Sequence, residues 1–419
     1  MGGLAVGIDF GTSNSAAALP GVHTDAPARV LSIDPTGDSA QLLRSVLFFP
    51  EGANETLVGG EAITRYLEEG EGRFLQSVKS FLPSKTFTRT EIRRRSYGLE
   101  ELVAVLLRAI KARIEAEAGG EVASLVLGRP ALFHEEAEQD AKAQERLRQA
   151  ALIAGFPEPR FVIEPIAAAL HYEEALTRDE VVLVGDFGAG TSDFTVMKLG
   201  PSHRGASDRR ADVLGASGVY IGGDKFDAAI VEHRLLRLFG HGSTYKSMLK
   251  ELEIPGWMTR KLLAWHELSL LRERSTLEFL RQAKKSSSDK TGVDNLIVLA
   301  EENLGYHLFR AVEATKRELS GAEVSRVTFS RAGIELDEPV TRAEFERWTA
   351  PLRDGLTKTA EKALAQAGGV RPDAVFLTGG TSRIPSVRRL FAETFGEERL
   401  REGDAFTSVA AGLGRAAAL

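Results

Sequence analysis

The chain has 419 residues, 43% of them hydrophobic, so it can bury a large core, and its length favours two or more domains. It contains no cysteine, which excludes disulfides, thiolate catalysis and cysteine-ligated metals and favours a reducing compartment, for which we predict the cytoplasm. With a net charge of -6 and no run of about 20 apolar residues, we expect binding to neither nucleic acid nor membrane.

The first half of the chain predicts strands that give way to alternating helices and strands. Strand-like runs are LAVGIDF, SAAAL, ARVLSI and SVLFF. From Leu99 the apolar residues recur at helical spacing, and Gly119-Gly120 ends this helix. A strand (SLVLGRP), a helix ending near Gly155, a strand (RFVIEP) and a helix (IAAALHYEEAL) follow, which is typical of an α/β fold.

The second half repeats this alternation after a long insertion. From Phe226 to about Leu319 the pattern is mostly helical, with an exposed loop predicted at KKSSSDK. A helix from about Pro351 to Gln366, the strand AVFLTGG, the helix RIPSVRRLFAETFG and the terminal helix SVAAGLGRAAAL follow. The sequence therefore predicts two α/β halves, each with an insertion.

Two stretches share one design. LAVGIDFGTSNSAAAL and VVLVGDFGAGTSDFTVMKL each pass from an apolar strand through Asp-Phe-Gly and small hydroxyl residues into a second strand. A carboxylate at the end of a buried strand needs compensation, and glycine turns expose N–H groups that bind phosphate. Either turn alone could be an ordinary hairpin. Because Mg²⁺ bridges carboxylates to phosphates, the pair Asp9 and Asp186 predicts a Mg-nucleotide site.

Other phosphate-binding motifs do not fit. The sequence has no G-x-x-x-x-G-K-[ST], and the glycines of VGDFGAG do not open a helix, which disfavours a P-loop or a Rossmann fold. A third glycine turn, FLTGGTSRIP, places Gly379 and Gly380 before a helix, where Thr381 and Ser382 could simply cap it. Arg383 has a guanidinium plane that stacks well on a flat base.

Taken in order, GIDFGTSNS, FVIEPIAAAL, VGDFGAGTSDF, IGGDKFD, EATKRELS and FLTGGTSRIP resemble the nucleotide-binding domain of DnaK-type heat-shock chaperones, in the actin and sugar-kinase superfamily. LGRPALF, KSFL and FTSVAAGLGRA are most similar to a short bacterial branch, the YegD-like proteins, which has this domain without a peptide-binding domain. The resemblance implies an α/β, actin-like ATPase fold with two duplicated, ribonuclease-H-like lobes around a nucleotide cleft.

The resemblance also implies domain boundaries. Lobe I would comprise residues 1–178, with an inserted subdomain at about 36–120, and would be completed by a C-terminal helix at 396–419. Lobe II would comprise residues 179–395, with an inserted subdomain at about 228–339.

The resemblance further implies site residues and the ligands ATP, ADP and Mg²⁺. Asp9 and Asp186 would hold the water shell of Mg²⁺, and Glu164, Thr191 and Asp193 would be the catalytic groups near the attacking water. The residues implied to bind nucleotide are Gly11, Thr12, Ser13, Asn14, Gly188, Ala189, Gly190 and Thr191 at the phosphates, Gly222, Gly223 and Asp224 at the ribose, Glu313, Lys316, Arg317 and Ser320 at the adenosine, and Gly379, Gly380, Thr381 and Arg383 on the opposite wall.

Some of these residues have simpler interpretations or depart from the family pattern. Lys316 and Arg317 could be a solvated helix face, and Glu164 could cap the helix that follows it. Ala189 replaces a usual glycine, and Asp224 replaces a usual glutamate.

A larger departure concerns a lysine that the family carries in a VGxxAK segment and that would reach the γ-phosphate. The segment LVGGEAI places Ile63 at that position, so we expect the catalytic cation to be missing. Loss of one such charge donor typically costs about 10²–10³ in rate, which predicts slow hydrolysis. Lys79, in QSVKSFL, matches a different family lysine.

The leading hypothesis is therefore a monomeric, chaperone-type, DnaK-like protein that binds Mg-ATP, hydrolyses it slowly, and has its closure state read by an unknown protein partner or client. Residues Asp404 to Leu419 complete the last predicted helix and leave none for a peptide clamp, so we expect no unaided foldase activity. The alternatives are a non-hydrolysing ATP-dependent interaction protein, an actin-like filament former, and a small-molecule kinase of the same superfamily.

Overall fold

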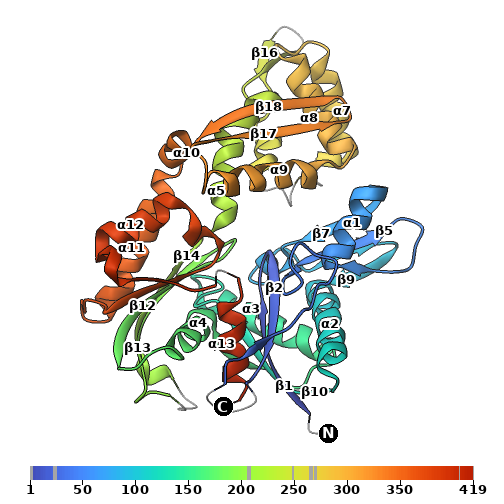
Figure 1. Ribbon diagram of the computed structural model, residues 1–419. Helices are drawn as coiled ribbons and strands as arrows, with labels where there is room; N and C mark the ends of the chain where they lie inside the picture. The colour runs from blue at the N-terminus through green and yellow to red at the C-terminus, as the bar shows by residue number, and fades with distance from the viewer. Residues whose placement is uncertain are drawn as a thin grey trace. The chain divides into compact units, whose positions relative to one another are not determined.

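The computed structural model of the protein describes residues 3–21, 26–204, 209–247, 250–263, 268, 271–404 and 406–418 (Figure 1). The chain divides into two compact units: unit 1 comprises residues 1–222, 355–383 and 387–419, and unit 2 comprises residues 223–354 and 384–386. Unit 2 contains the insertion predicted at 228–339, whereas the division into lobes at residues 178 and 179 stays a prediction. Within the described residues, no helix is both long and apolar enough to cross a bilayer.

The first sheet of unit 1 contains the first acidic turn. Its strand order is β11-β10-β1-β2-β3, and β4 also pairs with β2. The strands are β1 (Leu4–Phe10), β2 (Asn14–Leu19), β3 (Arg29–Val30), β4 (Leu43–Arg44), β10 (Val122–Arg129) and β11 (Arg160–Ile163). β1 forms an antiparallel hairpin with β2 and pairs in parallel with β10. Covered on both faces, β1 is nearly continuously apolar, as buried strands are.

The second sheet repeats this design around the second acidic turn. Its order is β14-β13-β12-β19-β20. The strands are β12 (Glu180–Phe187), β13 (Ser192–Leu199), β14 (Val213–Val219), β19 (Ala374–Thr378) and β20 (Leu400–Glu402). β12 forms an antiparallel hairpin with β13 and pairs in parallel with β19. The predicted duplication of a strand-turn-strand device inside an α/β fold is therefore confirmed.

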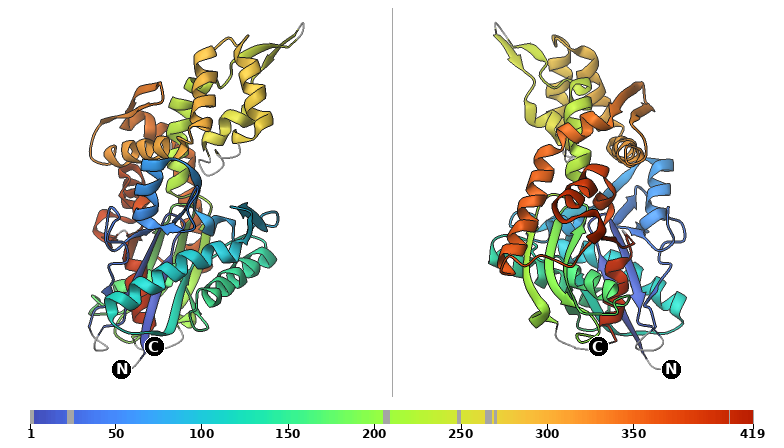
Figure 2. Two further views of the ribbon diagram at one scale, coloured as in Figure 1. Left: turned by 90° about the vertical axis from the view of Figure 1, so that its right-hand side faces the viewer. Right: turned by 60° about the vertical axis from the view of Figure 1, so that its left-hand side comes forward.

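Helices cover both sheets of unit 1. They are α1 (Gly59–Glu69), α2 (Leu99–Ala118), α3 (Ala137–Ile153), α4 (Glu164–Glu173), α11 (Ala350–Gln366), α12 (Pro385–Phe395) and α13 (Ser408–Ala416). α13 packs on β1 and β2, and α4 packs on β12 and β13, so these two helices join the sheets through a shared core. α2 and α3 lie side by side and bury their apolar residues with those of β1 (Figure 2).

The contact between α4 and α13 depends on small residues. A Cβ added at Gly412 would lie 1.7 Å from the carbonyl oxygen of Ala167, so only glycine allows the two helices this close. Ala167 and Ala410 are both completely buried. The small-residue pattern of the terminal helix is thus explained by packing.

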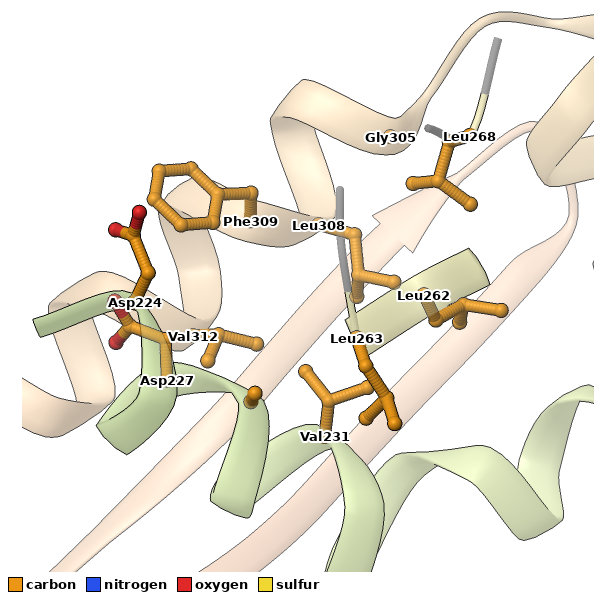
Figure 3. A pocket seen from close by; sticks show the side chains of 11 residues that line it. Asp224, Asp227, Val231, Leu262, Leu263, Leu268, Gly305, Leu308, Phe309 and Val312 are labelled. Atoms are coloured by element: carbon orange, nitrogen blue, oxygen red, sulfur yellow. The ribbon is translucent and has the colours of Figure 1, made fainter. Parts of the chain in front are cut away.

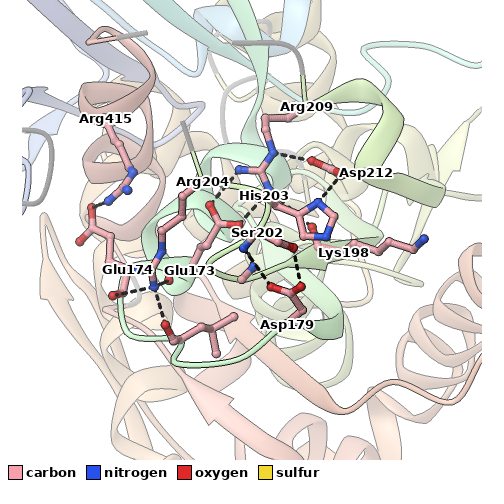
Figure 4. Close-up of polar contacts among 12 residues, drawn as sticks. Glu173, Glu174, Asp179, Lys198, Ser202, His203, Arg204, Arg209, Asp212 and Arg415 are labelled. Carbon is pink, nitrogen blue, oxygen red and sulfur yellow. Dashed lines mark hydrogen bonds and ion pairs between the residues drawn. The ribbon is translucent and has the colours of Figure 1, made fainter. Parts of the chain in front are cut away.

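Ion pairs fix the C-terminal end of α4 (Figure 4). Glu173 is 1% exposed and binds Arg209 through two bonds of 2.8 and 2.9 Å. Arg204 donates to the carbonyl of Glu173, where a cation also complements the helix dipole. Glu174 pairs with Arg415 of α13 at 2.9 Å. Because Glu173 is paired and bonded, its burial is compensated.

Smaller elements complete unit 1. They are β5 (Val46–Pro50), β6 (Leu57–Val58), β7 (Gly72–Gln76), β8 (Arg89–Ile92), β9 (Arg95–Gly98) and the 3₁₀ turns η1 (Val78–Phe81), η2 (Arg210–Asp212), η7 (Gly380–Arg383) and η8 (Glu397–Arg399). The strands pair as β6-β5-β7 and β8-β9. The turn η1 follows β7 after one residue, Ser77, and carries Lys79, a residue of the candidate site.

Unit 2 combines helices with two hairpins. Its elements are α5 (Gly223–Ile230), the π-helix η3 (Val231–Leu235), η4 (Leu236–Phe239), β15 (Thr244–Ser247), β16 (Lys250–Glu253), α6 (Gly256–Arg260), η5 (Lys261–Leu263), α7 (Arg274–Lys284), α8 (Lys290–Glu301), α9 (Gly305–Glu318), β17 (Val324–Arg331), β18 (Ile334–Thr341) and α10 (Arg342–Trp348). The predicted helices and the loop between α7 and α8 are confirmed, but this loop is not exposed throughout, since Ser287 is buried. The hairpin of β15 and β16 is not part of the helical prediction, because its short, polar strands carry little alternation.

Candidate functional site

The two acidic turns meet inside unit 1. Asp9 and Asp186 each stand one residue before the end of a strand, and both are partly buried. Burial raises the pKa of Asp186 well above its usual value, and the charges of Glu164, Asp9 and Asp193 add to the effect. These four carboxylates, which we call the carboxylate cluster, are therefore neighbours, as the resemblance implies.

The second turn carries a second acid across its hairpin. Asp193 on β13 pairs directly with Asp186 on β12, whereas Asp9 on β1 pairs with Ala16 on β2. Like charges directly opposite one another on adjacent strands are destabilising. The second turn therefore concentrates more negative charge than the first.

Burial and the charge of Glu164 raise the pKa values of two members of the cluster, Asp9 and Asp193, to near neutrality. Burial, followed by the charge of Glu164, raises the pKa of Asp9 to about 7. The same two causes raise the pKa of Asp193 to about 7, against a hydrogen bond from Thr191. Raised carboxyl pKa values of this kind are typical of functional sites.

Lys79 is the cation of the cluster. Its ammonium lies 2.7 Å from Glu164 Oε1, and the two residues are only 8% and 9% exposed. Although burial would lower the pKa of Lys79, the charges of Glu164 and Asp9 raise it, so the ammonium stays charged. If all four carboxylates ionise, three negative charges remain uncompensated by this lysine.

Local backbone geometry brings Lys79 to this place. After β7, Ser77 adopts a left-handed conformation with φ of 53°, which turns the chain into η1 and buries Val78 and Lys79. The Ser77 carbonyl accepts hydrogen bonds from the N–H and the hydroxyl of Ser80, at 2.9 and 2.7 Å. A non-glycine residue in this region is strained by about 1–3 kcal/mol, which is common at functional sites.

Ile63 lies on α1, whose residues pack on β5, and a lysine from a different segment, Lys79, is paired inside the carboxylate cluster. The isoleucine at position 63 therefore does not leave the cluster without a cation. The interpretation of Glu164 as a helix cap is wrong. It is the first residue of α4 and makes no side-chain cap, because its carboxylate faces Lys79.

The glycine turns beside the cluster lie against one another. A Cβ at Gly379 would fall 2.1 Å from the carbonyl oxygen of Phe187, and Gly379 has φ of 88°. A Cβ at Gly222 would fall 2.3 Å from the carbonyl oxygen of Ala189. Only glycine permits such approach of two backbones. The residues just after β14, the β12–β13 turn and the turn after β19 thus converge.

Asp193 has one carboxylate oxygen without a partner. Thr191 donates to its Oδ2 at 3.3 Å, and a hydrogen bond from the backbone of Ala131 lowers its pKa. Its Oδ1 is buried and accepts no hydrogen bond from the described residues. Gly218 makes room for this atom, since a Cβ there would lie 2.6 Å away. A buried acceptor without a donor is costly, so the atom suits a ligand or a water.

The residues expected at the ribose and adenosine lie in unit 2, apart from Gly222, Gly379, Gly380, Thr381 and Arg383 of unit 1. Lys316 on α9 pairs with buried Asp227 on α5 at 2.8 Å and also donates to the carbonyl of Gly223. Its ammonium therefore joins two helices, and only Arg317 fits a solvated face. Burial, followed by the charge of Asp227, raises the pKa of Asp224 to about 7.

Asp224 and Asp227 lie at one end of a small pocket in unit 2 (Figure 3). The other lining residues come from α9 and from the chain before it and are mostly apolar, including Leu262, Leu308 and Phe309. The sequence motif IGGDKFD predicts Asp224 but not this apolar surround, which forms only when the helices pack.

Among the described residues, the structure thus places Asp9, Glu164, Asp186 and Asp193 together and adds Lys79 and the Ala131 backbone to them. Within the same described part, no three Asp, Glu or His side chains form a ready group of metal ligands. The remaining predicted phosphate-side residues are Gly11, Thr12, Ser13, Asn14, Gly188 and Gly190, which form the two hairpin turns. The segment QSVKSFL matches a family lysine, but the pairing of Lys79 with Glu164 is not visible in the local sequence because the two residues are 85 positions apart.

Comparison with known proteins gives a consistent result. Residues 60–246 and 279–419 match the family model described as Hsp70 protein. The chain is 27% identical over 420 residues to the chaperone protein DnaK of Thermosipho melanesiensis, covering 99% of this chain and 59% of that protein. It is 28% identical over 417 residues to DnaK of Thermus thermophilus, covering 94% of this chain and 57% of that protein. The chain thus spans less than two thirds of the length of these relatives.

Proposed function

Because the chain belongs to the Hsp70 family, we propose that it binds Mg-ATP at the carboxylate cluster and the glycine turns of unit 1 and hydrolyses it to ADP and phosphate. One observation carries the proposal. Four carboxylates with one buried lysine among them stand beside two hairpin turns whose glycines, Gly11, Gly188 and Gly190, are exposed or partly exposed, an arrangement that is costly without a cationic ligand.

The residues fit a magnesium ion. Asp9 and Asp186 are the partly exposed members of the cluster, and carboxylate oxygens are the donors that Mg²⁺ prefers. Mg²⁺ keeps several waters, so these two residues would hold it through its water shell. When bound, the ion would neutralise charge on the phosphate oxygens.

The buried members of the cluster suit the chemistry of hydrolysis. Lys79 provides a fixed positive charge, which would stabilise negative charge as it shifts on the γ-phosphate. Glu164 accepts a hydrogen bond from the ammonium of Lys79 at 2.7 Å and would therefore position this ammonium. The unpartnered Oδ1 of Asp193 is left to accept a hydrogen bond from the attacking water, and a pKa of about 7 suits a general base at neutral pH. Thr191 would orient Asp193.

The remaining parts of the proposal follow from family membership. The residues Gly11 to Asn14 and Gly188 to Thr191 would bind phosphates, and Glu313, Lys316, Arg317, Ser320 and Arg383 would contact the adenosine. Hydrolysis would be coupled to closure of two lobes and read by a protein partner, in the cytoplasm, with the chain as a monomer. Pull-down experiments with and without ATP would identify that partner.

Calorimetry and single-turnover hydrolysis test the site directly. The wild-type protein should bind ATP in the presence of Mg²⁺, and binding should weaken about tenfold or more in Asp9→Ala and in Asp186→Ala. ADP production measured with excess enzyme separates hydrolysis from binding. Unchanged Mg-ATP affinity in both variants would rule out the carboxylate cluster as the site. Binding without ADP production would favour an interaction protein that uses ATP only as a ligand.

A further inference from the structure

Phe406 is an exposed aromatic residue at the edge of the proposed nucleotide site. It lies two residues before α13, it is 41% exposed, and it belongs to unit 1. The guanidinium carbon of Arg383 lies 5.6 Å from the centre of the Phe406 ring. A Cβ at Gly380 would lie 3.3 Å from Cε1 of the same ring. The ring therefore packs on Gly380 and Arg383, two of the four residues that the resemblance implies for the wall opposite the adenosine helix.

The turn that carries Phe406 is held by several hydrogen bonds. Asp404 Oδ1 accepts the N–H of Phe406 at 2.9 Å and the N–H of Thr407 at 3.1 Å. The carbonyl oxygen of Asp404 accepts the hydroxyls of Thr378 at 3.2 Å and Ser408 at 2.6 Å. Thr378 is the last residue of β19, and the chain continues from it to Gly380. The ring is thus fixed relative to the glycine turn.

The chemistry of this pair suits a flat base. An arginine guanidinium and an aromatic ring both stack on planar groups, and neither selects among bases by hydrogen bonds to their edges. The contact with Phe406 also restricts Arg383, so less freedom is lost when a base stacks on it. A large exposed aromatic side chain is otherwise unfavourable in water, and its burial by a ligand would be favourable.

We propose that Phe406 and Arg383 form one stacking wall for the base of the bound nucleotide, and that Phe406 is a specificity-determining residue that favours purine over pyrimidine nucleotides. The inference rests on the proposed function, because it assumes that the phosphates bind at the glycine turns. It assigns a role to Phe406, which lies in the segment FTSVAAGLGRA but is not among the site residues that the resemblance implies. A purine has a larger ring system than a pyrimidine and therefore gains more from stacking. The expected preference for purines thus depends on the stacked area and not on hydrogen bonds to the edge of the base.

Calorimetry with three probes tests this role. In Phe406→Ala, the Kd for Mg-ATP should rise about tenfold or more, because stacking of one base on one aromatic side chain is typically of that size. The Kd for Mg-tripolyphosphate, which has no base, should stay unchanged. The ratio of the CTP and ATP dissociation constants should fall. Phe406→Tyr should keep the wild-type values, and Ile153→Ala, at a 45% exposed position on α3, is the matched control.

A second variant covers the case in which Phe406→Ala does not fold. In Phe406→Trp, Mg-ATP should quench the new fluorescence relative to the wild-type background, and Mg-tripolyphosphate should not. Equal affinity of Phe406→Ala and wild type for Mg-ATP, or equal weakening for ATP and tripolyphosphate, would overturn the inference and leave the proposed function intact. Failure of the wild type to bind Mg-ATP would instead refute the proposed function itself.

Discussion

The two acidic turns share one fold but differ in charge. In the first turn, Asp9 faces Ala16 across the β1–β2 hairpin, so its strand partner is a small apolar residue. In the second turn, Asp186 faces Asp193 across the β12–β13 hairpin. The same backbone device therefore holds one carboxylate in one sheet and two in the other.

The difference shows how a duplicated element can acquire two roles. A single partly buried carboxylate can be compensated by one ligand. Two carboxylates that face one another also repel, and this repulsion increases the free-energy cost of ionising either of them. Lys79 lowers the pKa of acids in both turns, so one cation serves both. We infer that the first turn mainly binds, and that the second turn both binds and supplies the group that activates water.

Removing the shared cation should have the largest effect. In Lys79→Met we expect single-turnover ATP hydrolysis to fall about 10²–10³-fold, because one preorganised charge donor is lost. Stability should also fall, since Glu164 becomes a buried charge without a partner. Lys85→Met is the control, because Lys85 is an exposed lysine whose side chain is 57% accessible. Wild-type hydrolysis in Lys79→Met would show that another group supplies the charge.

Neutralising one acid in each turn should separate binding from stability. Asp9→Asn and Asp186→Asn should each weaken Mg-ATP binding about tenfold or more, measured by calorimetry. Without nucleotide, both should raise the melting temperature at pH 8, because a repelled charge is removed. The increase should be larger for Asp186→Asn, since Asp186 also faces Asp193. A larger increase for Asp9→Asn would contradict the comparison.

The pH dependence of stability should report on Asp193. Its pKa is about 7 in the folded protein against an ordinary 3.8, so between pH 4 and 7 the folded state keeps a proton that the unfolded state has lost. The contribution of Asp193 to unfolding free energy is therefore favourable below about pH 4 and is lost as the pH rises through 7. Denaturant unfolding without nucleotide, carried out at several pH values, gives the difference in the free energy of unfolding between wild type and Asp193→Asn. Wild type should lose stability relative to the variant over this window, and a constant difference would argue against the shift.

The smallest effect is expected at Ile63. On the proposal that Lys79 supplies the cation, Ile63→Lys should change single-turnover hydrolysis by less than about twofold. The same assay run on Lys79→Met with and without Ile63→Lys asks whether the new lysine can replace the old one, and we expect no rescue. A tenfold acceleration in Ile63→Lys alone would restore the view that the native site lacks a catalytic charge.

Much of the fold is predictable because its signals are local. The strands on both sides of Asp9 and of Asp186 are apolar runs interrupted by glycine, and this pattern predicts hairpins whatever lies elsewhere in the chain. The same holds for α2, whose apolar positions recur at helical spacing until Gly119 adopts a left-handed conformation. The acids and glycines of the site follow, because they belong to these turns.

The pairing of charges required the tertiary structure. Lys79 and Glu164 are 85 positions apart, and the carboxylates alone give no indication of which lysine compensates them. The segment LVGGEAI places Ile63 at the position of a family lysine, which suggests a site without a cation. The left-handed turn at Ser77 instead brings Lys79 into the cluster. Likewise, Phe406 resembles an ordinary loop residue until it packs on Gly380 and Arg383.

The reason is the range of the interactions. Strand and turn propensities depend on neighbours within a few residues, so hairpins, helices and the acids at their ends can be read from the order of amino acids. Burial and electrostatic compensation depend on distance in space, and they are decided only when segments far apart in the chain are packed together. In this protein the positions of Asp9 and Asp186 belong to the first kind, and the partnership of Lys79 with Glu164 belongs to the second.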